Sequence, residues 1–295
     1  MPDIPLIGPV APPDVHIMTY NIRRRIPRLM PHSPDRWDRR RVLIRRLLRA
    51  EQPGILGVQE ALPDQAKFVR RALGDSYRSL GYGRNSNKRG EGCPLLFDSD
   101  RFELLEWEQT ALSSTPHIPG STSWGNPTPR VVVAATFRGR ATGIEFRALN
   151  THFDQRSRRS RMWSADEILR LLAQSKLPTL VTGDFNSDDD SLVHGAMIAT
   201  GALLDTWDTA ERRVTESWGS FANYGPPKRE RKRIDWILAT PWVSVLRAGI
   251  NVTRYDGRWP SDHAPVQAAV HFGVSRNSSV PVAPLANSGD ATGSR

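Results

Sequence analysis

The feature of this chain that most limits its fold is a succession of short apolar runs, several of which follow one another with no helical pattern between them. Such runs, bounded by Gly, Pro, Asn or Asp, are typical of β-strands. They occupy 15–22, 54–61, 94–99, 102–113, 131–137, 144–154, the segment from 178, 233–240, 243–252 and 263–272. Helical patterns are expected from Pro34-Asp35 to Glu51 and at 64–73, 160–174 and 191–204. This mixture predicts two packed sheets with helices outside them rather than a doubly wound parallel sheet.

The chain has 295 residues, enough for one large domain or two small ones. Without a convincing internal linker, we expect one domain over 15–273, preceded by an extended lead-in at 1–14 and followed by a disordered tail at 274–295. No apolar run approaches the roughly 20 residues of a membrane span. The N-terminus also lacks the basic and apolar parts of a secretory signal. These features predict a cytoplasmic protein, a monomer, that does not enter a membrane.

The formal net charge of +10 predicts attraction to an anionic partner. Nearly all of the basic residues are arginines, whose planar fork suits phosphate better than the point charge of lysine. An equally weighted alternative is that arginine reflects codon usage on a solvated surface. The single cysteine, Cys93, excludes a disulfide within the chain and a zinc site built from several cysteines.

Polar side chains stand at the ends of the apolar runs, where rigid scaffolds often carry their chemistry. In the stretch PTLVTGDFNSDDD, Asp184 and Asn186 follow a buried strand. Taken alone, the triplet Asp184-Phe185-Asn186 is better explained by a turn with an Asx hydrogen bond. Comparable residues end or begin the other strands: Asn21, Glu60, His152, Asp235, Asp262 and His263. Charged groups seldom lie beside buried strands without partners, so these residues are expected to meet.

The residue types favour one reaction. Glu60 offers a hard oxygen ligand of the kind that Mg²⁺ or Mn²⁺ prefers, and histidines with further acids suit proton transfer and phosphate contacts. The chain has no H-E-x-x-H pattern for zinc hydrolysis and no G-x-S-x-G motif for acyl transfer. Hydrolysis of a phosphate ester by activated water is the chemistry that remains.

Six motifs occur in a fixed order, namely MTYNI, GVQEA, LNTHFD, TGDFNS, RIDWIL and PSDHAPV. Together they resemble the endonuclease/exonuclease/phosphatase (deoxyribonuclease I-like) superfamily of nucleases and phosphatases, over about residues 15 to 272. Two further stretches, GEGCPLLF and STPHIPGSTSWGNPTPR, are similar to a bacterial branch near the deadenylase-like members. The resemblance implies an α/β fold, a four-layered αββα sandwich with two packed, mainly antiparallel sheets.

The resemblance also implies roles for the metal and the attacking water. Asn21 and Glu60 would lie at a divalent metal, Mg²⁺ or alternatively Mn²⁺, with Asp262 close to it. Asp184 would orient or deprotonate the attacking water, and Asn186 would hold water or a phosphate oxygen. The three acids that follow, 188–190, match no family position and are expected to form a solvated loop.

The remaining family positions concern the phosphate. His263, paired with Asp235, would form a second catalytic centre. His152 would hydrogen-bond the scissile phosphate and be held by Glu91, and Arg130 would be a further phosphate contact. Which of Asp184 and His263 takes the proton stays open at this stage.

Two basic loops adjoin the motif strands and bear on the substrate. QRSRRSR at 155–161 places Arg156, Arg158 and Arg159 directly after His152, and YGPPKRERKR at 224–233 leads into Asp235. Such loops raise the local concentration of a polyanion. Four aromatic residues are candidates for base stacking, although core packing is the commoner role at such spacing: Trp124, Trp218, Phe221 and Tyr224.

The expected substrate is therefore nucleic acid, cleaved at phosphodiester bonds, or another phosphorylated substrate. The alternative is a phosphomonoesterase acting on a sugar phosphate or inositol phosphate with the same site, and a catalytically silent binding module is the least favoured class. The family's nucleic-acid enzymes often place a tyrosine at the scissile phosphate. Here only Tyr82 and Tyr224 are candidates, and neither aligns well. The longer duplex-gripping loops of abasic-site endonucleases are also not recognisable.

Overall fold

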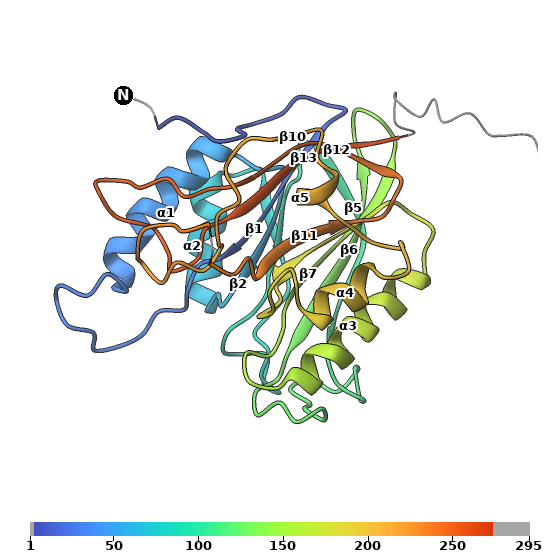
Figure 1. The fold of residues 1–295 in the computed structure, drawn as a ribbon, viewed down its shortest axis with the longest axis horizontal. Coiled ribbons are helices and arrows are strands. Elements are labelled where there is room, and N and C mark those ends of the chain that lie inside the picture. Colours follow the sequence, from blue (N-terminus) through green and yellow to red (C-terminus); the bar gives the residue numbers. More distant parts are fainter. Residues whose placement is uncertain (1–2, 230, 274–295) are drawn as a thin grey trace, which may run out of the picture.

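Two β-sheets form the centre of the molecule in the computed structural model, which describes residues 3–229 and 231–273 (Figure 1). The tail expected at 274–295 lies outside the described residues. The first sheet has the order β10-β12-β13-β1-β2-β4-β3 and the second β5-β6-β7-β8-β11-β9. The strands are β1 (Val15–Asn21), β2 (Ile55–Gln59), β3 (Tyr77–Leu80), β4 (Leu95–Asp98), β5 (Phe102–Ala111), β6 (Val131–Gly139), β7 (Glu145–His152), β8 (Thr179–Asp184), β9 (Leu204–Asp205), β10 (Arg212–Arg213), β11 (Asp235–Ala239), β12 (Val243–Ile250) and β13 (Val266–Phe272).

Helices cover the outer face of each sheet. Helices α1 (Trp37–Glu51) and α2 (Pro63–Leu73) pack on the first sheet through one apolar cluster, and α3 (Arg158–Ala173) and α4 (Leu192–Ile198) pack on the second through another. A third cluster fills the space between the sheets. The expected αββα sandwich is thus confirmed. No helix in the described part of the chain has the length and apolar character needed to cross a membrane.

Most neighbouring strands are antiparallel, but two parallel pairs determine where polar side chains gather. Strand β1 runs parallel to β2, with Asn21 opposite Gln59, and β7 runs parallel to β8, with His152 opposite Asp184. The antiparallel strand β11 begins beside the end of β8, with Asp235 opposite Asp184. Parallel neighbours end at the same edge of a sheet, so these residues reach one edge of the sandwich.

Some local elements differ from the pattern expected from the sequence. The helix expected over 191–204 ends at Ile198, and Gly201, with a φ of 70°, reverses the chain. The chain then forms the two-residue strand β9, which pairs with β11, and the short helix α5 (Thr206–Thr209). Helix α1 begins at Trp37 rather than at 34–35, and the side chain of Asp35 accepts from Tyr224 and Arg23 instead of capping the helix. These short elements depend on tertiary pairing, which a local pattern does not encode.

A buried polar layer joins the two sheets behind the edge just described. The amide of Asn150 donates to the carbonyls of Val58, Cys93 and Pro94, and its Oδ1 accepts from Gln59 at 2.7 Å. A side chain at Gly57 would collide with Asn150 and Thr182, so only glycine permits this close approach of the sheets. The layer fixes β2 against β7 where both strands approach the site.

One buried histidine makes stability depend on pH. His16, on β1, is fully buried with its Nε2 3.2 Å from Gln267 Oε1. Burial lowers the pKa of His16 to about 4, below the value of 6.5 in the unfolded chain. As pH falls from 6.5 towards 4, the unfolded chain therefore binds a proton at this histidine that the folded chain does not bind, and the free energy of unfolding decreases. Between pH 6.5 and 4, wild type is expected to lose about 3 kcal/mol more of its free energy of unfolding than His16→Gln. Urea denaturation over this pH range measures the difference, and parallel curves would contradict it.

Candidate active site

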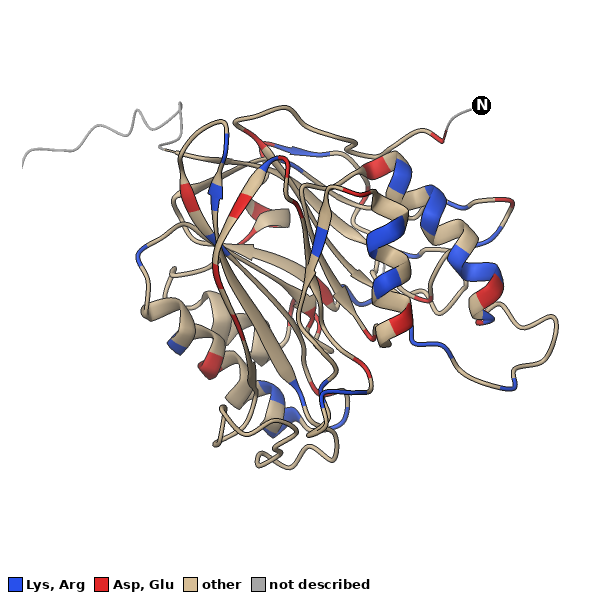
Figure 2. Ribbon diagram, turned by 180° about the vertical axis from the view of Figure 1, so that it is seen from behind, with Lys and Arg blue, Asp and Glu red and all other residues tan. Residues whose placement is uncertain are grey.

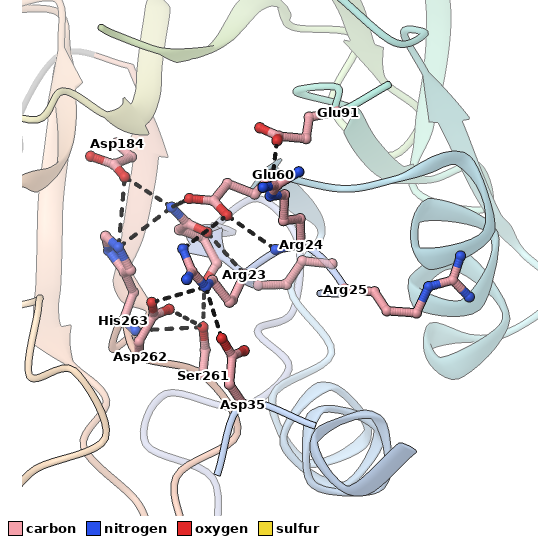
Figure 3. Close-up of polar contacts among 12 residues, drawn as sticks. Arg23, Arg24, Arg25, Asp35, Glu60, Glu91, Asp184, Ser261, Asp262 and His263 are labelled. Atoms are coloured by element: carbon pink, nitrogen blue, oxygen red, sulfur yellow. Dashed lines mark hydrogen bonds and ion pairs between the residues drawn. The ribbon is translucent and has the colours of Figure 1, made fainter. Parts of the chain in front are cut away.

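Polar side chains from both sheets meet at the edge where β1, β2, β7 and β8 end. Asn21, His152 and Asp184 are the last residues of their strands, Glu60 follows β2 directly, and Asp235 opens β11. Asp262 and His263 come from the loop before β13, which is held by a bridge between Phe221 and His263. All of these side chains except Glu60 are buried, and Figure 3 shows Asp184, Glu60, Asp262 and His263 gathered in one place. The sequence-predicted strand ends therefore do meet.

The amide of Asn21 is the hub of this cluster. Its Nδ2 lies 2.9 Å from Asp184 Oδ2, 3.2 Å from Glu60 Oε1 and 3.4 Å from His263 Nε2. Its Oδ1 accepts the backbone N–H of Arg23 at 2.9 Å, which fixes the orientation of the amide. This uncharged side chain thus donates to two carboxylates, and the imidazole of His263 lies against it.

Asp235 and His263 form a buried pair. His263 Nδ1 lies 2.9 Å from Asp235 Oδ2, so the Nε2 of the ring faces Asp184, 3.8 Å from its Oδ2. Burial lowers the pKa of His263, but the charges of Asp235 and Asp184 outweigh burial and raise it to about 10. Burial, with the charge of Asp235, raises the pKa of Asp184 to about 7. An imidazole oriented by a carboxylate is a familiar proton-transfer unit.

The cluster has the chemistry of a divalent-cation site. Ligand atoms of Asp184, Asp235 and His263 lie within 4.8 Å of one another, and Asn21 links them to the carboxylate of Glu60. In the described part of the chain, Asp235 Oδ1 is buried with no hydrogen-bond partner. The other oxygen of Asp235 pairs with His263, but the four acids Glu60, Asp184, Asp235 and Asp262 outnumber the neighbouring cations Arg23 and His263, and hard cations bind such oxygens.

Glu60 is held in a strained backbone conformation. Its φ is 59°, in the left-handed region that a non-glycine residue rarely adopts. Its Oε2 accepts the backbone N–H of Arg24 at 3.1 Å. Burial acts to raise the pKa of Glu60, but this hydrogen bond and the nearby charges of His263 and Arg23 lower it overall. Glu60 therefore stays ionised and aimed at the cluster.

Arg23 joins three acids on the other side of Glu60. Its Nε lies 3.3 Å from Asp35 and 3.5 Å from Asp262, and its Nη1 lies 3.8 Å from Glu60 (Figure 3). Asp262 is also fixed by the hydroxyl of Ser261, at 3.1 Å. Arg23 thus offsets repulsion between Asp262 and Glu60, the two acids predicted to lie at the metal.

A corner lined by two arginines and two glutamates adjoins Glu60. Arg84, Arg130 and His152 line one small hollow with Glu60, Glu91 and Cys93. Arg130 is buried, with its Nε 3.3 Å from Asp154 and its Nη1 lacking a partner in the described part of the chain. Burial and the charges of Arg130 and Arg84 hold the pKa of His152 well below its usual range. His152 is therefore neutral, with its Nε2 3.5 Å from Asp184.

Glu91 requires a correction. It was expected to hold His152, but its carboxylate is taken by Arg84 at 2.8 Å and by Arg24 at 3.3 Å. The two guanidinium groups are stronger partners for a carboxylate than a neutral imidazole. Glu91 thus fixes Arg84 in the corner and does not orient His152.

The loop after β8 also differs in part from the expectation. Asn186, with a φ of 48°, donates from its Nδ2 to the carbonyl of Phe153, which leaves its Oδ1 available, and its N–H donates to Asp184 Oδ1. Asp188 and Asp189 are not simply solvated, because they hold the backbone N–H and the guanidinium of buried Arg233. Arg233 also pairs with Asp205 at 2.9 Å. These contacts tie the loop bearing Asp184 to the start of β11.

Several predicted substrate contacts lie outside the cluster. Arg156, Arg158 and Arg159 are exposed around the start of α3, with no ion pair in the described part of the chain. Among the aromatic candidates, Phe221 lies against the ring of His263, with the ring centroids 4.8 Å apart. Trp124 stacks on Trp163, and Trp218 packs on the core. The hydroxyl of Tyr224 donates a hydrogen bond to Asp35. Tyr82 lies outside the cluster, beneath the amino group of Lys88.

Three residues of the site were missed from the sequence: Arg23, Asp35 and Arg84. Arg23 directly follows the MTYNI motif, and its proximity to Asn21 was the one available signal. Asp35 was assigned to a helix start, and Arg84 lies in a Gly- and Asn-rich loop with no motif. The contacts of Asp35 and Arg84 join segments that only the fold brings together.

Comparison with known proteins agrees with this geometry. The model of the Endonuclease/Exonuclease/phosphatase family matches residues 18–263. A structure of a Bacteroides thetaiotaomicron mannosyl-6-phosphatase is 28% identical, with a TM-score of 0.82, and the alignment covers 88% of this chain and 100% of that one. A structure of an endonuclease/exonuclease/phosphatase from Bacteroides vulgatus is 30% identical, with a TM-score of 0.81, and the alignment covers 88% of this chain and 99% of that one. Drosophila melanogaster Nocturnin is 23% identical over 66% of this chain, which spans 32% of that protein. The chain belongs to the endonuclease/exonuclease/phosphatase family.

Proposed function

We propose that this family phosphoesterase uses Mg²⁺ or Mn²⁺ and hydrolyses a phosphate ester by in-line attack of water. Glu60 would hold the metal, with Asp262 beside it, and Asn21, whose amide nitrogen faces the cluster while its oxygen accepts from Arg23, would orient the Glu60 carboxylate. When bound, the metal supplies positive charge that polarises a phosphoryl oxygen and stabilises the leaving oxygen. The observation that supports this assignment is the convergence of buried Asp184 and His263 and half-buried Glu60 around the amide of Asn21.

The chain's own residues have distinct parts in the reaction. Asp184 Oδ2 receives the proton of the attacking water, because the hydrogen bonds from Asn21 and from the N–H of Asn186 keep its carboxylate in place. His263, held by Asp235, presents a protonated Nε2 to a phosphoryl oxygen. Neutral His152 donates a further hydrogen bond to the phosphate, and Asn186 Oδ1 accepts one from the water. Preorganised donors of this kind lower the barrier where charge develops.

We propose a phosphomonoester as the substrate, the second of the two classes expected from the sequence. A terminal phosphoryl group carries up to two charges and three free oxygens, whereas a diester carries one charge and two. The corner beside Glu60 gathers Arg84, His152 and the unpartnered Nη1 of Arg130; the hollow is closed in the described part of the chain, so a phosphoryl group would have to open it to reach these donors. The similarity to a mannosyl-6-phosphatase over nearly the whole chain supports the same class.

A nuclease is the second candidate. The exposed side chains of Arg156, Arg158 and Arg159 follow His152 closely in sequence and suit a polyanion. The other basic loop supports this candidate less, because Arg233 is buried in ion pairs and Arg229 pairs with Glu216. The two candidates differ in whether the scissile phosphate is terminal.

A magnesium-dependent assay separates them. Purified chain is expected to release inorganic phosphate from p-nitrophenyl phosphate and from sugar monophosphates, with little cleavage of DNA, RNA or bis(p-nitrophenyl) phosphate. Arg130→Gln should lower kcat/KM for the monoester by about a hundredfold, the worth of a charge-assisted contact, and that for the diester much less. Arg147→Gln, which is also buried but donates to the carbonyl of Leu171 outside the corner, is the matched control. Cleavage of polymers without phosphate release would reject the monoester proposal in favour of the nuclease.

A further inference from the structure

A second pocket lies next to the candidate active site. It is a cavity of ≈ 160 Å³ between the loop before α1, the start of α1 and the segments around Tyr224 and Trp259. Its polar and aromatic lining is His32, Arg39, Arg40, Tyr224, Arg258 and Trp259. Figure 2 shows that Lys and Arg gather along α1 and α2, the helical layer that contributes Arg39. No proposed catalytic residue lines it.

The pocket carries positive charge that the protein leaves available. Arg39 and Arg258 are exposed and form no ion pair within residues 3–229 and 231–273. By contrast, Arg36 and Arg46 of the same region are paired with acids. The acids next to the lining are all engaged: Asp38 by Arg36, Asp256 by Arg46, and Asp35 by Arg23, Arg40 and Tyr224. Unpaired guanidinium groups at a concave surface favour an anion.

The pocket and the active site share a wall. The hydroxyl of Tyr224 donates to Asp35 Oδ1 at 2.9 Å, and Asp35 Oδ2 accepts from Arg23, which contacts Asp262. The neighbouring Asn223 N–H donates to the carbonyl of Asp262 at 2.9 Å. Burial raises the pKa of Tyr224, so its hydroxyl keeps the proton that it donates. A ligand in the pocket would therefore lie beside the residues that surround the metal position.

The aromatic lining is fixed in place. The indole Nε1 of Trp259 donates to the carbonyl of Val252 at 3.3 Å, and Arg254 lies over its ring at 5.3 Å from the centroid. Tyr224 is held by Asp35 and has a φ of 61°. Rigid rings beside free cations are typical of sites for a ring that bears an anionic group.

We propose that this pocket binds the non-reacting part of the substrate, a sugar or nucleoside ring with a second phosphate group. Arg39 and Arg258 would contact the second phosphate, while Trp259 and Tyr224 pack against the ring. The inference rests on the proposed function, because it assigns the scissile phosphate to the neighbouring site. It makes the substrate class a bisphosphorylated small molecule rather than a monophosphate.

Binding can be measured separately from turnover. The full chain is labelled with 5-fluorotryptophan, and the ¹⁹F resonance of Trp259 is identified by its loss in Trp259→Phe. Without divalent metal, glucose 1,6-bisphosphate is expected to shift this resonance and to bind about a hundredfold more tightly than glucose 6-phosphate, through one charge-assisted contact to each of Arg39 and Arg258. Arg39→Gln and Arg258→Gln should each weaken bisphosphate binding by about tenfold. Arg41→Gln, exposed on another face of α1, is the matched control and should leave it unchanged.

The outcomes distinguish the two proposals. If the Trp259 resonance moves with neither sugar, or if Arg258→Gln binds the bisphosphate as well as wild type does, the subsite is rejected. If the bisphosphate binds as expected but no phosphate is released with Mg²⁺, the proposed reaction fails and the subsite stands. Release of phosphate from both sugars at equal kcat/KM, with no shift of Trp259, would keep the reaction and reject the subsite.

Discussion

His263→Ala is expected to lower kcat by about three orders of magnitude, within the range for removal of an acid–base residue. The imidazole is oriented by Asp235 at 2.9 Å, and its Nε2 faces Asp184 and the amide of Asn21. Alanine removes the donor to the phosphoryl oxygen and leaves Asp235 without its partner. KM should change much less than kcat, because the contact strengthens as charge develops on the phosphoryl group. Initial rates with p-nitrophenyl phosphate and Mg²⁺ measure both quantities.

The control is another histidine paired with an aspartate. His271 lies on β13 with its Nδ1 2.9 Å from Asp14, far from the cluster along the same strand. His271→Ala should retain wild-type kcat. Circular dichroism and thermal unfolding establish that both variants keep the fold. Near wild-type turnover by folded His263→Ala would remove this residue from the reaction.

The sheet core was predictable because burial and periodicity coincide along single strands. Val15, Ile17 and Ile55 lie in alternating or continuous apolar runs, and all three are buried between the sheets. The two-residue strands β9 and β10 have no such signal, since pairing with β11 and β12 defines them. Their formation is a consequence of the fold.

The cluster itself was predictable for a related reason. Asn21, Asp184 and Asp235 are polar residues at the ends of apolar strands, and β1 and β8 deliver theirs to one edge of the sandwich. Arg84 and Arg233 could not be assigned in this way. Arg84 meets Glu91 across a loop, and Arg233 meets Asp205 through the pairing of β9 with β11. A basic residue in a basic loop looks the same in sequence whether it is paired or free.

The arginines named above include two kinds with different parts, one buried and paired and the other exposed and, among the described residues, unpaired. Arg40 and Arg233 are buried and hold carbonyl or carboxylate oxygens, so they stabilise loops around the site. Arg39 and Arg258 are exposed and unpaired in the described part of the chain, next to the aromatic pocket. The net charge alone predicted an anionic partner. The positions of the arginines without an ion pair in the described part of the chain indicate where the anionic group of that partner would bind.

Glu60→Gln is expected to weaken binding of Mn²⁺ by at least about a hundredfold, since even residues outside the ligand shell can be worth 10- to 100-fold. The substitution keeps the size of the side chain but removes the negative charge that a hard cation requires. Glutamine keeps one acceptor oxygen, so it can accept from Asn21 or from the N–H of Arg24 but not from both, and circular dichroism and thermal unfolding establish that the variant keeps the fold. Electron paramagnetic resonance of free Mn²⁺ measures the affinity without substrate or turnover.

Glu91→Gln is the matched control for this measurement. Glu91 lines the same corner as Glu60, but its carboxylate is occupied by Arg84 and Arg24. Its neutralisation should leave Mn²⁺ affinity within a few fold of wild type, because the metal would not contact it. Equal losses in both variants would mean that the total negative charge of the corner attracts the cation. A loss in Glu91→Gln alone would move the metal away from Glu60, and the roles of Asn21 and Asp262 beside it would have to be reassigned.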